Sequence, residues 1–257
     1  MTKVHLDISG KIAEIRLDNP AKLNALTVGM LEALENVAGR IEDDQDIRTV
    51  LLTATGERAF CVGADIREWG ELDPREFSRI WVKRGHRIFD RIARLPVPVI
   101  GVLSGHAFGG GLELAAACDL RIAAPTATFA LPETGVGIVP GWSGTQRLAR
   151  QIPEAVLKEM ALTGSRLKAD RAYQIGFINA VSDSPRKDAQ EMAEQIAATA
   201  PQATETAKWM VSAAVGDDTG ASIEALAGAA MAPTGEKSEG VAAFMAKRKP
   251  DFEGFQS

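Results

Sequence analysis

The stretch GHAFGGGLELAAACD, residues 105–119, places three consecutive glycines and then a glutamate at the start of an alanine-rich helix. A phosphate-binding P-loop would need a lysine followed by serine or threonine after the glycines, and none is present. A dinucleotide-binding fold would need an acidic residue roughly 20 positions on, at the end of a second strand, whereas Glu133 follows a proline in a predicted loop. The glycine-rich stretch therefore predicts neither kind of nucleotide site.

Bare glycine backbone at a helix N-terminus suits a different chemistry. The peptide N–H groups of Gly109 to Gly111 would approach a ligand closely and point at a developing negative oxygen, which is half of an oxyanion hole. The alternative is that these small residues only let the helix pack tightly. A second stretch, ERAFCVGADI (57–66), places Gly63 and Ala64 in a loop after the predicted strand TVLLTAT (49–55), so this interpretation gives two converging backbone donors.

Strands and helices alternate along the chain up to residue 140. HLDI (5–8) and KIAEIRLD (11–18) alternate in polarity and predict a hairpin, and apolar residues at helical spacing predict a helix over 27–40 with Thr27 as its N-cap. Because a unit of two strands and one helix cannot bury its own apolar face, we expect α/β units of the ββα type to stack. The later units are the predicted helix 76–95, the strand VPVIGVLS (97–104), the glycine helix, and the strands LRIAA (120–124) and TFAL (128–131).

After Pro140 the sequence predicts almost continuous helix, interrupted by one predicted strand, FINAVS (177–182). We therefore expect a ββα core over residues 1–195 that holds the active site and a C-terminal helical region over 196–257. Alanine-rich helices with narrow apolar faces are typical of helices that pack against another chain. The sequence thus predicts that the region 196–257 mediates oligomerisation.

Composition excludes several classes of function. With 257 residues and 46% hydrophobic side chains the chain can bury a large core, and its net charge of −5 argues against a nucleic-acid surface. The two cysteines are far apart and the three histidines lack metal-ligand spacing, so we expect reduced thiols and no metal. The opening residues lack a signal-like apolar run and no stretch is long enough to span a membrane, which predicts a cytoplasmic protein.

Five motifs together resemble the enoyl-CoA hydratase/isomerase, or crotonase, superfamily along nearly the whole chain. They are NPAKLNALT (19–27), FCVGADI (60–66), GHAFGGGLELAAACDLRIA (105–123), FALPETGVGIVPGWSGTQRL (129–148) and AFMAKRKPDF (243–252). The resemblance implies a crotonase-like spiral of repeated ββα units with a C-terminal helical region. It also implies acyl-CoA substrates without a further cofactor, and trimers that stack into hexamers.

The resemblance also implies where the substrate lies. Ala64 and Gly110 take the oxyanion-hole positions, where their amides hold the thioester oxygen. Gly109 and Pro132 would contact the substrate nearby. Coenzyme A would lie along two segments of the chain and touch two residues from the C-terminal region of a neighbouring subunit. These contacts are Lys22, Leu23, Ala64, Asp65, Ile66 and Arg67, with Phe244 and Lys247 from the neighbour.

Two glutamates carry the expected chemistry. Glu113 is one helical turn after Gly110 and should face the same cavity, and Glu133 comes from a separate loop. In the superfamily, hydrating members keep both positions and isomerases typically keep only the second. Adding water across a C2–C3 double bond needs a base for the water and an acid for C2, and two close carboxyls do this because burial and repulsion separate their pKa values. We assign Glu113 as base and Glu133 as acid, with the Gly141 backbone near the water.

The sequence leaves other functions open. An enoyl-CoA isomerase, a hydratase specialised for an unusual acyl group, and a non-catalytic or RNA-binding relative are the alternatives. Trp142 departs from the superfamily, where many members have a small residue such as alanine. If its ring faces the pocket it favours short or conjugated acyl groups; otherwise it closes a subunit contact. Trp69 and Trp81 belong to a segment that would line the acyl end.

Overall fold

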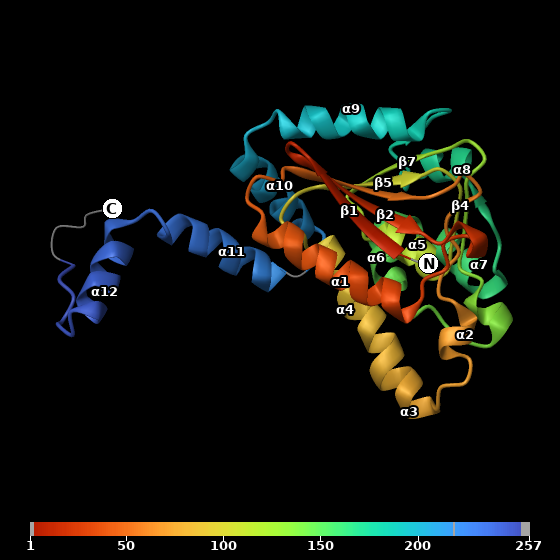
Figure 1. Cartoon of the computed structure of the whole chain (residues 1–257), viewed down its shortest axis with the longest axis horizontal. Helices are drawn as coiled ribbons and strands as arrows, with labels where there is room; N and C mark the ends of the chain where they lie inside the picture. The colour runs from red at the N-terminus through yellow and green to blue at the C-terminus, as the bar shows by residue number, and fades with distance from the viewer. Residues whose placement is uncertain (1–2, 218, 253–257) are drawn as a thin grey trace. The chain divides into compact units, whose positions relative to one another are not determined.

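The N-terminal hairpin begins the larger of two β-sheets in the computed structural model, which describes residues 3–217 and 219–252 (Figure 1). The alternating polarity of the second strand becomes an alternation of buried and half-buried side chains, as predicted. Beyond the hairpin, each strand pairs in parallel with the next. The spatial order is β1 (Lys3–Ser9), β2 (Ile12–Asp18), β3 (Thr49–Ala54), β5 (Val99–Leu103), β7 (Leu120–Ala123) and β10 (Ala180–Val181).

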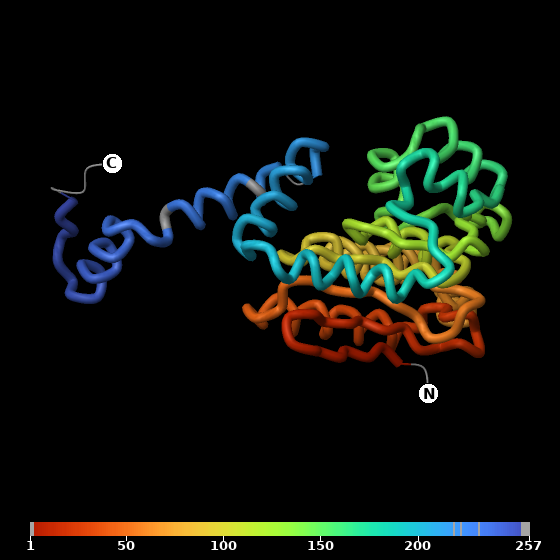
Figure 2. The backbone as a smooth tube through the Cα atoms, turned by 90° about the horizontal axis from the view of Figure 1, so that it is seen from above, coloured from red at the N-terminus to blue at the C-terminus, as the bar shows by residue number. Residues whose placement is uncertain are grey.

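A second, smaller sheet runs beside the first and consists of very short strands. Its order is β4 (Ala59–Cys61), β6 (His106–Phe108), β8 (Thr128–Ala130) and β9 (Leu167–Lys168). Consecutive strands of the chain alternate between the sheets, since β3, β5 and β7 belong to the first and β4, β6 and β8 to the second. Each turn of chain therefore adds one strand to both sheets, which is the spiral of ββα units that the sequence predicts. Figure 2 shows these turns stacked in chain order, beginning with the red hairpin.

Helices cover the sheets and complete the turns. Helix α1 (Val28–Asp43) begins where the sequence predicts, because the Thr27 hydroxyl accepts the Met30 N–H at 3.2 Å. Helix α9 (Pro185–Ala197) lies along the first sheet and packs against β3, β5 and β7 (Figure 1). The other helices of the core are α2 (Ile66–Trp69), α3 (Pro74–Glu76), α4 (Lys83–Ala93), α5 (Gly110–Ala116), α6 (Gly144–Gln151), α7 (Glu154–Thr163) and α8 (Ala169–Gln174), with the short turns η1 (Pro20–Lys22) and η3 (Glu133–Val136).

The helix predicted over 76–95 contains an irregular segment. Helix α3 continues into η2 (Phe77–Val82), a π-helical stretch, and then into α4, so the chain is helical from Pro74 to Ala93. Asp73 and Glu76 form a capping box at its start. The π-helical stretch carries two aromatic side chains that line the cavity described below, which agrees with the frequent occurrence of such segments at functional sites.

The chain divides into two compact units, Met1–Thr204 and Glu205–Ser257. The division lies within α10 (Pro201–Ala214), later than the predicted boundary between 195 and 196. The second unit holds α11 (Thr219–Met231) and α12 (Gly235–Met245). Arg248, which follows α12, donates to Glu239 of that helix at 2.6 Å. Within the described residues, no helix has the length and apolar character that a membrane crossing needs.

Candidate active site

The glycine-rich stretch packs closely against β4 and also bends the chain beside a cavity. Gly109 has φ +52° and ψ −127°, a conformation that only glycine adopts readily, and its N–H donates to Ala130 O at 2.9 Å. This bend turns the chain into α5, which begins at Gly110. A side chain at Gly111 would overlap the carbonyl oxygen of Cys61 on β4. Close packing therefore explains Gly111, whereas Gly109 and Gly110 shape the backbone beside a cavity.

The loop around Gly63 meets this bend, as the sequence predicts. Gly63 has φ +98°, and a Cβ added there would lie 3.1 Å from Phe108 O and 3.2 Å from the Gly110 nitrogen. Ala64 is held by a bridge to Leu26, whose N–H donates to Gly63 O at 2.8 Å. Within the described residues, the amides of Ala64 and Gly110 donate to no acceptor. Two unpaired peptide donors thus lie on adjoining loops.

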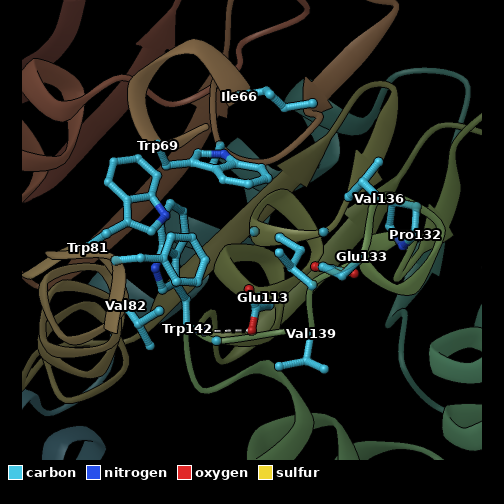
Figure 3. Close-up of a pocket in the computed structure, with 16 residues that line it drawn as sticks. Ile66, Trp69, Trp81, Val82, Glu113, Pro132, Glu133, Val136, Val139 and Trp142 are labelled. Carbon is cyan, nitrogen blue, oxygen red and sulfur yellow. Dashed lines mark hydrogen bonds between the residues drawn. The ribbon is translucent and has the colours of Figure 1, made fainter. Parts of the chain in front are cut away.

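A cavity of about 150 Å³ opens beside both loops (Figure 3). Its lining comes from α2, η2, α5, η3 and the loop before α6. In Figure 3, Trp69 and Trp81 lie on one side and Glu133 with Pro132 and Val136 on the other. Nine predicted site residues line it: Ala64, Ile66, Gly109, Gly110, Glu113, Pro132, Glu133, Gly141 and Trp142.

Glu113 projects from the first turn of α5 and is only 2% exposed. Its Oε1 accepts two amide hydrogen bonds of 2.9 Å, from Trp142 and from Gly144. Both amides reach one oxygen because Ser143 between them adopts the left-handed conformation, with φ +68°, so that the N–H groups on either side of it form a small anion cradle. The Glu113 pKa is raised overall, because burial outweighs the opposing effects of the two amides and of the Arg147 charge. These contacts favour the charged form against the cost of burial.

Glu133 begins η3 and is 7% exposed, with a different set of neighbours. Its Oε2 is buried and has no hydrogen-bond partner among the described residues. Its Oε1 lies only 3.0 Å from where a Cβ on Gly109 would stand, so glycine there also makes room for this carboxyl. Burial, and then the nearby charge of Glu113, raise the Glu133 pKa to about 7. The two carboxyls therefore have unlike environments, which is the arrangement that an acid–base pair needs.

A second layer of residues holds the cradle around Glu113, and the sequence analysis missed it. Ser143 Oγ donates to Asp90 Oδ1 at 3.0 Å, and Arg147 forms an ion pair with the same carboxylate. His86 Nε2 lies 3.2 Å from Asp90 Oδ2. Asp90 thus ties α4 to the start of α6. Ser143 and Arg147 fall in the motif over 129–148, whereas His86 and Asp90 fall in none, because no local pattern links α4 to that stretch.

Trp142 faces the cavity, which decides between the two interpretations of this residue. Its ring is 3% exposed and packs against Trp81 at 5.3 Å and against Phe89 at 5.2 Å, edge to face. The indole lies against Gly85 of α4, where any side chain would overlap it. Trp69 and Trp81 line the same cavity, as the sequence predicts.

The remaining predicted coenzyme A contacts do not line this cavity; they are Lys22, Leu23, Asp65 and Arg67. The Lys22 ammonium forms an ion pair with Asp65, whose other oxygen accepts the Arg67 N–H at 3.2 Å and caps α2. Phe244, on α12, is 82% exposed and Lys247 follows that helix. The contact of Phe244 and Lys247 with coenzyme A remains a prediction.

Known proteins resemble this chain both in sequence and in architecture. A family model described as Enoyl-CoA hydratase/isomerase matches residues 7–256. The chain belongs to the enoyl-CoA hydratase/isomerase family. Within this family, it is 36% identical to a short-chain-enoyl-CoA hydratase of Clostridium acetobutylicum over 100% of this chain and 99% of the relative. It is 42% identical to the Bacillus subtilis protein YngF, named a putative enoyl-CoA hydratase/isomerase, over 95% of both chains.

A solved member of the enoyl-CoA hydratase/isomerase family has the same fold. The crystal structure of an enoyl-CoA hydratase from Bacillus anthracis superposes with a TM-score of 0.81 at 35% identity, covering 98% of this chain and 99% of that one. The ββα spiral with its C-terminal helices is therefore the crotonase fold that the motifs predict.

Proposed function

We propose that this enzyme is a hydro-lyase that reversibly adds water to a 2-enoyl-CoA and gives a 3-hydroxyacyl-CoA. The observation that carries the proposal is a pair of buried carboxyls, from α5 and η3, which line one cavity with two unpaired peptide amides. The full-length likeness to a protein named short-chain-enoyl-CoA hydratase supports the same reaction. No cofactor is needed, because coenzyme A is part of the substrate.

The amides of Ala64 and Gly110 hold the thioester oxygen in this mechanism. Attack at C3 sends electron density toward that oxygen, and the amides stabilise the resulting enolate without moving. A single donor of this kind lowers the barrier by about 3 to 4 kcal/mol. The donors act more strongly here than in water because the lining of the cavity is largely apolar.

Glu113 and Glu133 move the two protons. In the hydration direction, Glu113 accepts a proton from water as the oxygen attacks C3, and Glu133 delivers a proton to C2. The assignment rests on hydrogen bonding, because burial raises the pKa of both carboxyls. Two amides donate to Glu113 and support its charged form, whereas Glu133 has a buried oxygen without a partner among the described residues, which favours its protonated form. The reverse reaction begins with the proton on Glu113, so both directions use a pair that holds one proton.

The test is turnover of crotonyl-CoA, followed by loss of the conjugated-thioester absorbance. We expect activity in the unaltered enzyme and a loss of at least a thousandfold in Glu113→Gln and in Glu133→Gln, with Glu71→Gln, at an exposed position outside the cavity, as the matched control. Absence of turnover with every enoyl-CoA, or full activity in both variants, would contradict the proposal. Double-bond migration without hydration would instead indicate an isomerase.

Assembly, location and the coenzyme A path complete the proposal. We infer that the second unit mediates trimers or dimers of trimers, since α10 to α12 expose large apolar side chains such as Val211, Val241 and Met245. Light scattering after size exclusion tests this. We also propose that coenzyme A lies along 22–23 and 64–67, that Phe244 and Lys247 of a neighbour touch it, and that the enzyme is cytoplasmic.

A further inference from the structure

The walls of the cavity narrow the choice of acyl group. We propose that the cavity binds a 2-enoyl-CoA carrying an uncharged aromatic ring on C3, and that Trp142 with Gly85 determines this selectivity. The inference rests on the proposed hydratase function and specifies its substrate class.

Aromatic side chains are scarce in this chain but concentrated here. They make up 5% of the residues, yet three of the four tryptophans line this cavity, together with Phe77. The Trp69 and Phe77 rings are tilted by 57° with centroids 5.7 Å apart, and the Trp81 and Trp142 rings by 52° at 5.3 Å. When a ligand ring packs against such a pair, the aromatic contact stabilises the complex beyond the effect of the buried area alone. The lining therefore suits a flat, conjugated ligand (Figure 3).

Trp142 closes the cavity on the side of α4. Its indole rests where Gly85 has no side chain, so the ring is pressed against the helix backbone instead of turning outward. On its other edge, a Cβ at Gly110 would stand 2.8 Å from Cε3 and Cζ3. The ring thus fills the space between α4 and α5, next to the amide proposed to hold the thioester oxygen. An acyl chain cannot extend in that direction.

Size and charge restrict the ligand further. The volume of about 150 Å³ is similar to that of an engineered apolar cavity that binds benzene. Among the described lining residues, the only charged types are the two glutamates, and no lysine, arginine or histidine is present. An acyl group that carries a free carboxylate would be repelled by the two glutamates and would find no counter-ion in the lining. The ring must therefore be neutral.

The test compares three 3-hydroxyacyl-CoA probes in the dehydration direction, where the conjugated product is easily detected. The probes are 3-hydroxybutyryl-CoA, 3-hydroxydecanoyl-CoA and 3-hydroxy-3-phenylpropanoyl-CoA. We expect the phenyl probe to have the highest kcat/KM, at least tenfold above the decanoyl probe. A higher kcat/KM for either aliphatic probe than for the phenyl probe overturns the inference.

Variants then test the two residues that we hold responsible. Trp142→Leu keeps an apolar side chain but removes the ring, and should lower the phenyl-to-decanoyl ratio of kcat/KM at least tenfold. Gly85→Ala pushes the indole into the cavity and should lower kcat/KM for the phenyl probe more than for the butyryl probe. Trp209→Leu, on α10, is the matched control and should leave the ratios unchanged. An equal effect of Trp142→Leu on all probes would show that Trp142 does not select the ring.

Failure of this inference can be told apart from failure of the proposed function. If none of the three probes is dehydrated, the hydratase function itself is wrong. If the butyryl probe is dehydrated and the phenyl probe is not, the function stands and the aromatic substrate class is wrong. The comparison of probes on the unaltered enzyme decides this even if Trp142→Leu does not fold.

Discussion

Replacing Glu133 by glutamine is expected to stabilise the protein at alkaline pH while abolishing turnover. The carboxyl is 7% exposed and its pKa rises from 4.5 to about 7, so the folded state holds this proton more tightly than the unfolded state. As the pH rises from 4.5 to about 7, the unfolded chain loses the proton first, and the free energy of unfolding falls. The full loss above pH 7 is about 3 kcal/mol as an upper limit. Glutamine has no such proton, so the variant escapes this loss.

The assay is urea unfolding of both proteins at pH 5 and at pH 8. The difference in unfolding free energy, variant minus parent, should grow by about 2 to 3 kcal/mol between the two pH values. Glu71→Gln, at an exposed position, controls for the general effect of removing a negative charge. If the difference is the same at both pH values, Glu133 does not carry a raised pKa in the folded state, and its proposed role as the acid loses its physical basis.

Four further predictions concern the site and the stability of the fold. The pH profile of kcat/KM for hydration should be bell-shaped and fall as the pH rises above about 7, because the pair then loses the proton that Glu133 holds. Asp90→Asn removes the partner of the α6 arginine and should lower kcat about ten- to a hundredfold with little change in KM, measured at saturating crotonyl-CoA. Gly111→Ala should destabilise the fold by about 3 kcal/mol in urea unfolding, because its Cβ overlaps Cys61 O. Gly228→Ala, where nothing obstructs a Cβ, should instead stabilise α11 by about 0.5 to 1 kcal/mol.

Elements with strong local signals could be predicted from the sequence. The hairpin follows from alternating polarity, and α1 follows from its apolar spacing and from the cap at Thr27. The second sheet could not be predicted in the same way. Strands such as Ala59–Cys61 and Leu167–Lys168 are too short to show a period, and they form only because the spiral brings them together. The loop expected after β3 therefore contains a strand, and the Gly63–Ala64 turn follows that strand.

The residues of the candidate site likewise fall into those that a local motif predicts and those that it does not. Glu113 and Glu133 stand in motifs, and the structure brings both to one cavity. The sequence left the direction of Trp142 undecided, because an indole fits equally well in a pocket wall or at an interface. Asp90 carries no local signal, since it lies more than fifty residues from the serine and arginine that it holds. Contacts of this kind depend on how α4 and α6 are placed in the fold, and a short sequence pattern does not predict that placement.

The seating of the Trp142 indole against Gly85 links two positions that are remote in sequence. A side chain at 85 cannot be gained while the indole is present, and the indole cannot be gained while a side chain stands at 85. Any evolutionary path between this protein and a relative with a small residue at the equivalent of 142 must therefore change the two positions in a fixed order. Relatives with tryptophan at that position should accordingly keep glycine in the facing helix, which makes this pair a marker for finding enzymes to which the proposed acyl preference extends.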